Sequence, residues 1–497
     1  MELDLDLKSI QEVRNLVAAS KVAQKKLGKY SQPEVDEIVK TISEVCAEQA
    51  EYLARLAVEE TGFGVYQDKI LKNILGSEMV YNYIKDMKTV GIINEDKEKK
   101  IVDIAVPMGV IASLIPSTNP TSTVMYKSLI SIKAGNAVIF SPHPKAKNCI
   151  LETVKIIRQS LRAMDVPEDL VQVITIPTIE ATNELMKHPD IGVILATGGP
   201  NMVKAAYSSG NPAIGVGAGN GPAFIEKSAN IQLAVKRIID SKTFDNGTIC
   251  ASEQFIITEQ SIKSKIIEEV KKQGGYFLNE EESLKVEGVL FRGNGSMNPE
   301  VVGKPATKVA QMSGIKVPRD TKVLLSEQTK VGPKYPFSRE KLCPVLGFFV
   351  EDDWKKACDR SIEIVNNEGI GHTMTIHSND ESIIREFALQ KPVMRLLVNT
   401  AAALGGVGAT TNLPPALTLG SGAMGGSSVS DNIGPMNLIN IRRLAYGVKE
   451  LEDLRNEENS QAVKPNKPNY SKESGEEISA YDIEKIVLEV IGKLSKK

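Results

Sequence analysis

The feature that most limits how this chain can fold is a series of short apolar runs between residues 109 and 226. Helical stretches separate the runs, and such alternation is typical of a mostly parallel sheet with helices on its faces. The runs are VIASLI (110–115), NAVIF (136–140), VQVITI (171–176), IGVILAT (191–197) and PAFIE (222–226). Because ligands of such folds bind at the carboxyl ends of the strands, the loops after these runs are candidate binding segments.

A second region of the same kind follows, and a helical region that begins at the N-cap Ser31 precedes the first. The helix and strands expected in the second region lie at 230–242, 254–258, 345–351, 372–378 and 395–400. Residues 401–435 are rich in Gly and small residues without a helical or strand period, which is typical of ordered loops over a functional face. The sequence therefore predicts an α/β protein with two βα regions.

Composition excludes several classes of partner. The 497 residues include 60 Lys and Arg against 62 Asp and Glu, so charge favours neither nucleic acid nor an anionic membrane surface. No apolar run reaches the roughly 20 residues that span a bilayer, and the N-terminal MELDLDLKS lacks the basic and apolar parts of a signal peptide. We expect a cytoplasmic protein with no membrane or nucleic-acid partner.

Five cysteines are widely spaced and contain no C-x-x-C pair, so they indicate neither a disulfide framework nor a zinc site. Cys46, Cys149, Cys343 and Cys358 lie in apolar or helical contexts and are expected to be structural. Cys250 differs because it follows Asp-Asn-Gly-Thr-Ile, in a turn where backbone N–H groups could stabilise an oxyanion. No histidine is adjacent, so the residues alone leave a catalytic and a structural role equally open.

Two other motifs point away from standard sites. GVGAGNG (215–221) has Asn220 where a dinucleotide fingerprint needs its third Gly, so close approach to a ligand or to the thiol better explains its glycines. His372 and His377 lie five apart on an expected strand and point to opposite faces, so they are no metal pair. His143 follows a strand end, where a cofactor contact and a structural hydrogen bond are both open.

The C-terminal end has the pattern of a tethered helix. Residues 455–477 are polar and contain Pro, which is typical of a linker. Apolar residues of 479–497 recur at helical spacing, and Ser479 and Asp482 form a capping pair. Such a helix cannot bury its apolar stripe alone, so we expect it to dock on the protein's own oligomer or on a separate partner.

Several motifs together resemble the CoA-acylating branch of the aldehyde dehydrogenase superfamily. They are TFDNGTICASEQ with Cys250, PSTNPTSTVMYKS with Asn119, AGNAVIFSPHPKAK, ATGGPNMVKAAYSSG, GVGAGNGPAFI, REKLCPVLG with Glu340, EGIGHTMTIHS and LTLGSGAMGGSSVSDNIGP. The similarity runs from about residue 10 to about residue 450. It is greatest to the aldehyde half of bifunctional aldehyde/alcohol dehydrogenases and to aldehyde dehydrogenases of bacterial microcompartments.

The resemblance implies an aldehyde dehydrogenase-like α/β fold, in which two βα domains with mostly parallel sheets are joined by oligomerisation strands. The first domain would bind NAD and span 1–228, with oligomerisation strands near 97–107. The segments implied after it are a catalytic domain (229–415), a return segment with an oligomerisation strand (416–452), a flexible linker (453–478) and an amphipathic helix (479–497). Similarity at 437–447 to the second dimer-forming strand implies a homodimer or a tetramer.

Residue by residue, the resemblance makes Cys250 the nucleophile. It makes the Asn119 side-chain amide, together with the Cys250 backbone N–H, the oxyanion hole. NAD, or alternatively NADP, would bind without a G-x-G-x-x-G turn. The implied cofactor contacts are Ser117, Thr118, Asn119, Pro120, Thr121, Gly199, Gly217, Glu340, which is placed for the nicotinamide ribose, and Met424, where bifunctional relatives often have Trp.

The reaction implied by the resemblance converts an aldehyde, coenzyme A and NAD+ to acyl-CoA and NADH through a thioester on Cys250. Hydrolytic relatives carry a glutamate where this chain has Val216, and loss of a general base removes about 10²- to 10⁴-fold in rate. Coenzyme A is therefore expected to resolve the thioester, with acetaldehyde or propionaldehyde as the favoured substrate. The alternatives are a hydrolytic NAD-dependent aldehyde dehydrogenase, an acyl-phosphate semialdehyde reductase and a non-catalytic scaffold.

The tail fits the same resemblance. Enzymes of microcompartments commonly carry a short amphipathic helix on a linker at either terminus. Residues 479–497 are therefore expected to recruit the protein to microcompartment shell proteins or to a co-encapsulated aggregate, which would place it in a bacterial microcompartment within the cytoplasm.

Overall fold

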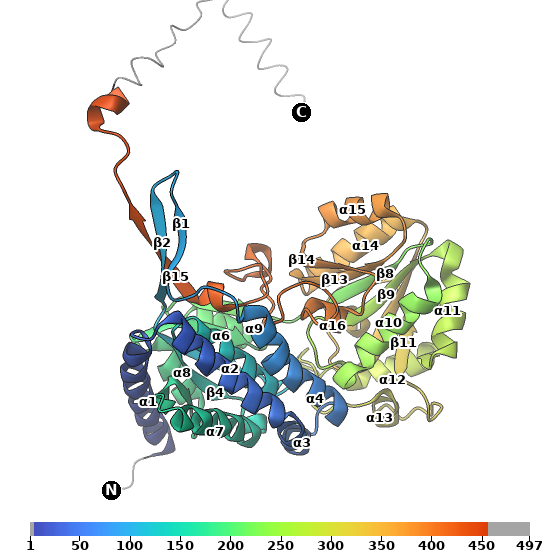
Figure 1. The fold of residues 1–497 in the computed structure, drawn as a ribbon. Coiled ribbons are helices and arrows are strands. Elements are labelled where there is room, and N and C mark those ends of the chain that lie inside the picture. The colour runs from blue at the N-terminus through green and yellow to red at the C-terminus, as the bar shows by residue number, and fades with distance from the viewer. Residues whose placement is uncertain (1–3, 456–497) are drawn as a thin grey trace, which may run out of the picture. The chain divides into compact units, whose positions relative to one another are not determined.

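The computed structural model describes residues 4–455. The expected tail helix (479–497) and nearly all of the expected linker lie outside the described residues. The chain divides into two compact units, one of residues 1–95 with 102–444 and one of residues 96–101 with 445 onward. The first unit holds both large sheets and the helices around them (Figure 1).

The N-terminal region is helical, as expected. Its helices are α1 (Leu5–Leu27), α2 (Gln32–Glu48), α3 (Ala50–Thr61), α4 (Tyr66–Ile74) and α5 (Val80–Ile84). The backbone N–H of Ser31, the N-cap of α2, donates to the Glu34 carboxylate at 2.7 Å. Gly62 ends α3 in the left-handed region with φ 66°. These helices supply both the cover of the first sheet and, through α4, part of the site described below.

The first large sheet is parallel and has five strands in the order β5-β4-β3-β6-β7. Its elements are β3 (Val110–Ile115), α6 (Pro120–Lys133), β4 (Ala137–Pro142), α7 (Lys147–Ala163), β5 (Val171–Val173), α8 (Ile179–Lys187), β6 (Ile191–Thr197), α9 (Pro200–Tyr207) and β7 (Ala213–Val216). Both faces of β3 are buried: Ile111 packs with residues of α6 and α7, whereas Ala112 and Leu114 pack with residues of α1 and α8. Burial on two faces explains the uninterrupted apolar runs.

The second large sheet has seven parallel strands in the order β10-β11-β12-β9-β8-β13-β14. Its elements are β8 (Gly221–Ile225), α10 (Ile231–Thr243), β9 (Glu253–Glu259), α11 (Lys263–Lys272), β10 (Gly275–Phe277), α12 (Glu280–Leu290), α13 (Ala306–Met312), β11 (Val323–Glu327), β12 (Val345–Glu351), α14 (Trp354–Asn367), β13 (Gly371–His377), α15 (Glu381–Gln390) and β14 (Val393–Val398). The α/β prediction with two mostly parallel sheets is confirmed. Strands β10 and β11 were not expected.

The assignment of one run to the first sheet was wrong. PAFIE was expected with the first sheet, but β8 pairs in parallel with β9 and β13 of the second. The chain therefore passes into the second sheet before Gly221, inside the segment predicted as the NAD-binding domain (1–228). The sequence of a strand that is apolar on both faces does not indicate which sheet it pairs with.

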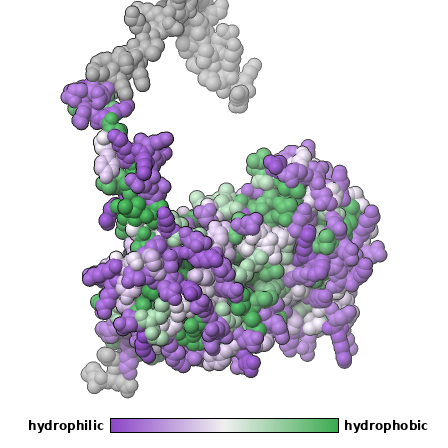
Figure 2. Space-filling view, viewed as in Figure 1, coloured by the Kyte–Doolittle hydropathy of each residue, from purple (hydrophilic) through white to green (hydrophobic). Residues whose placement is uncertain are grey.

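Three further strands form a separate sheet. They are β1 (Gly91–Asp96), β2 (Ile101–Pro107) and β15 (Ile439–Ala445), in the order β1-β2-β15. β2 and β15 coincide with the segments expected to join subunits. Ile92, Ile441 and Leu444 are exposed on this sheet, and Figure 2 shows hydrophobic residues along it. Exposed apolar strands are a candidate interface, and the dimer or tetramer stays a prediction.

The other sequence expectations concern loops, cysteines and the membrane. Residues 401–435 are mostly irregular, apart from the short helix α16 (Ala402–Gly406), a 3-10 turn (Ala423–Gly425) and the first residue of another (Pro435–Leu438). All five cysteines are free, and the four that were expected to be structural are buried. In residues 4–455 no helix is both long and apolar enough to cross a bilayer.

Candidate active site

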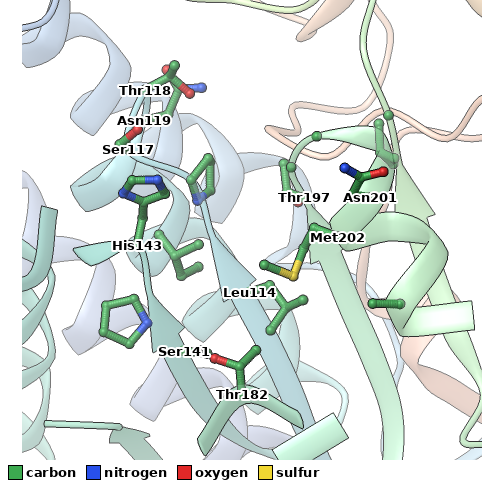
Figure 3. Close-up of a pocket in the computed structure, with 18 of the residues that line it drawn as sticks. Leu114, Ser117, Thr118, Asn119, Ser141, His143, Thr182, Thr197, Asn201 and Met202 are labelled. Atoms are coloured by element: carbon green, nitrogen blue, oxygen red, sulfur yellow. Dashed lines mark hydrogen bonds between the residues drawn. The ribbon is translucent and has the colours of Figure 1, made fainter. Parts of the chain in front are cut away.

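A cavity of about 640 Å³ lies at the carboxyl ends of β3, β4, β6 and β7. Figure 3 shows residues 117–119 on one side of it and Asn201 and Met202 on the other. Cys250 and Glu340 complete the wall, and Glu340 is the only carboxylic acid that lines it among the described residues. Both the position and the volume are typical of a site for a cofactor or small molecule.

The loop that carries Cys250 is shaped by three successive residues with left-handed backbone. Asp245, Asn246 and Gly247 have φ of 48°, 52° and 78°. Asp, Asn and Gly reach this region most readily, although Asp and Asn still lose about 1 kcal/mol each. The Asp-Asn-Gly sequence therefore turns the chain sharply between α10 and β9 and brings Cys250 to the cavity.

The Asp245 carboxylate is buried and binds groups from α4 and from its own loop. Its Oδ2 accepts hydrogen bonds from Lys69 Nζ at 3.0 Å, from Lys72 Nζ, and from Thr248 Oγ1 at 2.6 Å. Its Oδ1 accepts from the Val65 N–H at 2.7 Å. Burial acts to raise the pKa of this carboxyl, but the two ammonium groups hold the pKa below its ordinary value. Asp245 is therefore an anion that joins the cysteine loop to α4.

Lys72 also contacts the residue predicted as the oxyanion donor. Its Nζ donates to Asn119 Oδ1 at 2.6 Å and to the Thr248 backbone oxygen at 3.2 Å. Burial lowers the pKa of Lys72 to about 8, against the opposing pull of Asp245. The lysine therefore stands between the anchoring carboxylate and Asn119.

The Cys250 thiol is not stabilised as a thiolate by the described residues. Burial raises the pKa of Cys250 to about 12, with a further rise from Glu340 and smaller opposing effects of Arg395 and Lys72. The resting group is therefore a thiol at neutral pH.

One glycine of GVGAGNG lies directly against the Cys250 loop. A Cβ added at Gly219 would lie 1.8 Å from the Cys250 carbonyl oxygen and 3.3 Å from His372 Cε1. The prediction that these glycines permit close approach to the thiol segment is confirmed at Gly219. Gly215 instead makes room for Val203 and the Tyr207 ring of α9, because an added Cβ would lie within 2.7 Å of each.

Glu340 connects this glycine loop to the cavity. Its Oε1 accepts from the Gly219 N–H at 3.0 Å, and its own N–H donates to Glu368 Oε2 at 2.9 Å. Burial, and then the charge of Glu368, raise the pKa of the Glu340 carboxyl to about 8. Near neutral pH this side chain is mostly an uncharged acid that is held in place by a backbone N–H.

A buried histidine lies beside the same loop. His372 Nδ1 is 3.0 Å from Thr373 Oγ1, and its buried Nε2 has no hydrogen-bond partner in the described structure. Burial, together with the nearby Arg395, lowers the pKa of His372 to about 3, so the ring is neutral. With so low a pKa the ring is a weak base in the ligand-free protein, and which of its nitrogens carries the proton depends on the tautomer.

The structure places most of the predicted cofactor contacts together. Those that line the cavity are Ser117, Thr118, Asn119, Gly199, Gly217 and Glu340. Pro120 and Thr121 are buried in α6 instead, where Thr121 Oγ1 donates to Asn73 Oδ1 at 2.7 Å. Met424 lies in a short 3-10 turn, is 49% exposed and is not part of the cavity wall. Contact with NAD stays a prediction for all of them.

His143 has both of the features left open by the sequence. It lines the cavity at the end of β4, and its Nδ1 accepts from the Lys145 N–H at 3.1 Å. The structural hydrogen bond uses one ring nitrogen only, so it does not exclude a ligand at the other.

Sequence reasoning missed several residues of this site, including the buried Asp245. Lys69 and Lys72 lie in YQDKILKNI, which resembles an exposed amphipathic helix, although both lysines are buried. Their spacing of three residues puts them on one helix face, but it does not show that this face is covered. His372 was considered only as half of a metal pair, and Arg395 only as part of a strand. Burial was the missing information in every case.

Comparison with known proteins identifies the family. The Aldehyde dehydrogenase family matches residues 4–276, more than half of the chain, and the chain belongs to this family. The bifunctional aldehyde-alcohol dehydrogenase AdhE of Escherichia coli K12 is 43% identical over 442 residues, which are 88% of this chain and 50% of that protein. The chain thus spans about half the length of the bifunctional relatives. The acetylating succinate-semialdehyde dehydrogenase of Clostridium kluyveri is 40% identical over 88% of this chain and 96% of its own length.

Solved structures agree with the fold. A probable aldehyde dehydrogenase from Listeria monocytogenes EGD-e has a TM-score of 0.90 and 60% identity, covering 91% of this chain and all of that one. An acetylating aldehyde dehydrogenase from Geobacillus thermoglucosidasius has a TM-score of 0.89 and 51% identity, covering 90% and 99%. A propionaldehyde dehydrogenase from Rhodopseudomonas palustris, crystallised with bound CoA and an acylated cysteine, has a TM-score of 0.79 and 30% identity, covering 87% and 97%.

Substitution of Gly219 tests the close packing of the glycine loop on the cysteine loop. Gly219→Ala is expected to lower the melting temperature by about 3 to 6 °C, because the new Cβ overlaps the Cys250 carbonyl. Gly217→Ala is the matched control, since no atom lies within 4 Å of a Cβ there, and its melting temperature should stay within about 1 °C of the parent. Equal melting temperatures for the two variants would contradict the packing.

The raised pKa of Cys250 predicts how the thiol reacts in the absence of ligands. Alkylation by iodoacetamide, followed by peptide mass spectrometry, is expected to accelerate about tenfold per pH unit from pH 7 to pH 10, because only the thiolate reacts. The four buried cysteines serve as internal controls within the same digest. A rate that reaches a plateau below pH 9 would show that the thiol is already ionised there.

Proposed function

We propose that this protein is a CoA-acylating aldehyde dehydrogenase, which converts a small aldehyde, coenzyme A and NAD+ to acyl-CoA and NADH. The observation that carries the proposal is the pairing of Cys250 with Val216 in one cavity, whose only carboxylic acid among the described residues, Glu340, is hydrogen-bonded to the Gly219 N–H. Relatives named as acetylating enzymes support it, as does the structure with bound CoA and an acylated cysteine.

The cavity fits NAD in position and chemistry. It lies at the carboxyl ends of a parallel sheet, where hydroxyl groups of Ser117 and Thr118 and the N-terminal end of α9 at Gly199 line it. Helix N-termini and hydroxyl groups suit the anionic pyrophosphate of a dinucleotide. When bound there, NAD+ supplies a hydride acceptor. We propose NAD rather than NADP as the usual cofactor, following the family resemblance.

The acylation step uses the loop and the amide described above. The Cys250 sulfur bonds to the aldehyde carbon, and the carbonyl oxygen becomes an oxyanion that accepts from Asn119 Nδ2 and from the Cys250 N–H. One such donor stabilises the transition state by about 3 kcal/mol. The thiol is protonated at rest, so its proton must leave the sulfur when the new bond forms. We propose His372, which lies beside Gly219, as the acceptor; with a pKa of about 3 in the ligand-free protein it can serve only once bound ligands have raised that pKa. Departure of the hydride leaves a thioester on Cys250.

The product depends on whether water or the CoA thiol attacks the Cys250 thioester faster. Val216 offers no base for water, and Glu340 is mostly protonated near neutral pH and hydrogen-bonded to Gly219. Water therefore lacks the general-base assistance that contributes about 10²- to 10⁴-fold. The CoA thiol is a good nucleophile without such assistance. Thiolysis conserves the energy of the thioester, so the overall reaction is reversible.

The substrate we propose is a short aliphatic aldehyde, acetaldehyde or propionaldehyde. Support comes from the acetylating relative of 51% identity and the propionaldehyde dehydrogenase of 30% identity. The alternatives are a hydrolytic aldehyde dehydrogenase, a reductase that acts on an acyl phosphate, and a scaffold without activity. No residue of the cavity specifically favours any of these alternatives.

A nucleophile-exchange assay separates these functions. We expect NADH formation from acetaldehyde or propionaldehyde to need CoA and to fall at least about 10²-fold without it, with acyl-CoA as the product by mass spectrometry. Cys250→Ala is expected to abolish the reaction, which a scaffold would not predict. Turnover to free acid at a comparable rate without CoA would favour the hydrolytic alternative, and phosphate replacing CoA would favour the reductase.

We further propose that the tail recruits the enzyme to a bacterial microcompartment. The support is the apolar helical period of residues 479–497 and the polar segment before it, both read from the sequence. A fluorescent reporter fused to residues 455–497 is expected to co-purify with shells of such a compartment. A fusion in which Ile486 and Ile491 are changed to Asp is the control, because it keeps the length and breaks the apolar stripe. Equal recovery of the two fusions would contradict shell recruitment by the stripe.

A further inference from the structure

The N-cap of α6 has an unusual hydrogen-bond arrangement. Asn119 occupies the N-cap, where an asparagine side chain ordinarily accepts from a backbone N–H of the first turn. Here its side chain makes no cap bond, and Oδ1 accepts from Lys72 instead at 2.6 Å. The Asn119 side chain therefore bonds to Lys72 and not to the first turn of α6. The other end of the amide then belongs to the cavity that Asn119 lines.

The identity of the contact atom follows from the chemistry of lysine. An ammonium group has three N–H donors and no acceptor, so it can bind the amide only through oxygen. The Nδ2 group therefore points away from Lys72. A neutral hydrogen-bonding partner such as a serine hydroxyl would accept either orientation of the amide. Lys72 is thus the group that decides which end of Asn119 is presented.

The ammonium group itself is held firmly. Lys72 is 2% exposed, and its other contacts are the Asp245 carboxylate, the Thr248 hydroxyl at 3.2 Å and the Thr248 backbone oxygen at 3.2 Å. Both of these partner residues belong to the loop that carries Cys250. The position of the amide is consequently tied to the position of the nucleophile through a single nitrogen atom.

We propose that Lys72 is a positioning residue for the acylation step: it holds the Asn119 amide so that Nδ2, and not Oδ1, meets the oxyanion formed at Cys250. The inference rests on the proposed role of Asn119 as oxyanion donor. Lys72 acts through Asn119 and does not itself contact the aldehyde. An amide released from Lys72 can turn its oxygen toward the developing negative charge, which would repel it.

Charge supports the same arrangement. The Lys72 ammonium lowers the pKa of the Cys250 thiol, against the larger opposing effect of burial. A positive charge close to the nucleophile also favours a developing oxyanion. The charged groups that face Lys72 are Asp245, Lys69 and Asp68, and the two carboxylates favour its protonated form.

Lys69 provides a matched comparison within the same helix. It is also 2% exposed, and its Nζ binds the same Asp245 oxygen at 3.0 Å. Its second partner is the Thr118 backbone oxygen at 3.0 Å, and not the Asn119 side chain. Loss of Lys69 removes a buried ion pair with Asp245, as loss of Lys72 does, but leaves the amide held. The two variants therefore separate an effect on stability from an effect on amide orientation.

A double-mutant cycle in the full-length enzyme tests the proposal. The measured quantity is the single-turnover rate of NADH formation from aldehyde, with NADH affinity and melting temperature recorded for each variant. We expect a fall of about 10²- to 10³-fold for Asn119→Ala and of about 10- to 100-fold for Lys72→Met. Lys72→Met in the Asn119→Ala background should cost nothing further. Lys69→Met should lower the melting temperature as much as Lys72→Met does, but whatever it does to the rate should multiply with the effect of Asn119→Ala instead of disappearing in that background.

Each outcome decides a separate question. If Asn119→Ala leaves the rate unchanged, the proposed oxyanion role is wrong and the inference about Lys72 fails with it. If Asn119→Ala is slow but Lys72→Met is not, or if the two effects multiply in the double variant, only the inference fails. If Lys72→Met does not fold, Lys72→Gln, which keeps an N–H donor without the charge, replaces it in the cycle under the same criteria.

Discussion

The site depends on one buried carboxylate. Asp245 holds two lysines of α4 and the hydroxyl of Thr248, and it does so from a backbone with φ 48° that few residue types adopt readily. Removing one partner from a buried ion pair costs about 3 to 5 kcal/mol, because a charge is left without compensation. The left-handed turn and the burial of the lysines therefore stabilise each other, and the geometry at Cys250 follows from both.

In the ligand-free protein the titratable groups that surround the cavity are mostly uncharged. The thiol of Cys250 and the acid of Glu340 are both mostly protonated near neutral pH, and His372 is neutral. Lys72 shares the negative charge of Asp245 with Lys69, and Asp68 is a further carboxylate near it. Charge therefore develops in the cavity only when an aldehyde is present to accept the sulfur, and a preorganised donor stabilises such a charge better than water does. A protonated thiol is also slower to oxidise.

The elements that could be predicted from the sequence are those whose burial produces a recognisable apolar pattern. Strands such as β3, β6 and β12 were located because burial on both faces produces continuous apolar runs. The same property hid the sheet to which β8 belongs, and β10 is too short and too exposed to leave a run. Cys250 and Asn119 came from motif resemblance, whereas Lys72 was missed because a buried lysine has the same pattern as a surface one. Thr121 bonds to Asn73 instead of lining the cavity because of the rotation of α6 about its axis, which a sequence motif does not reveal.

The distance along the chain between α4 and Asp245 has a consequence for the order of folding. Lys72 and Asp245 are separated by 173 residues. While the ribosome is still making the second sheet, α4 carries two lysines whose anion does not yet exist, so that face of the helix has to stay hydrated. The first sheet can assemble early from its own strands, and α2 and α3 can pack on α6 and α7, but the side of α4 that carries Lys69 and Lys72 can be buried only after residue 245 has emerged. Formation of the loop that carries Cys250 would thus complete the packing of α4.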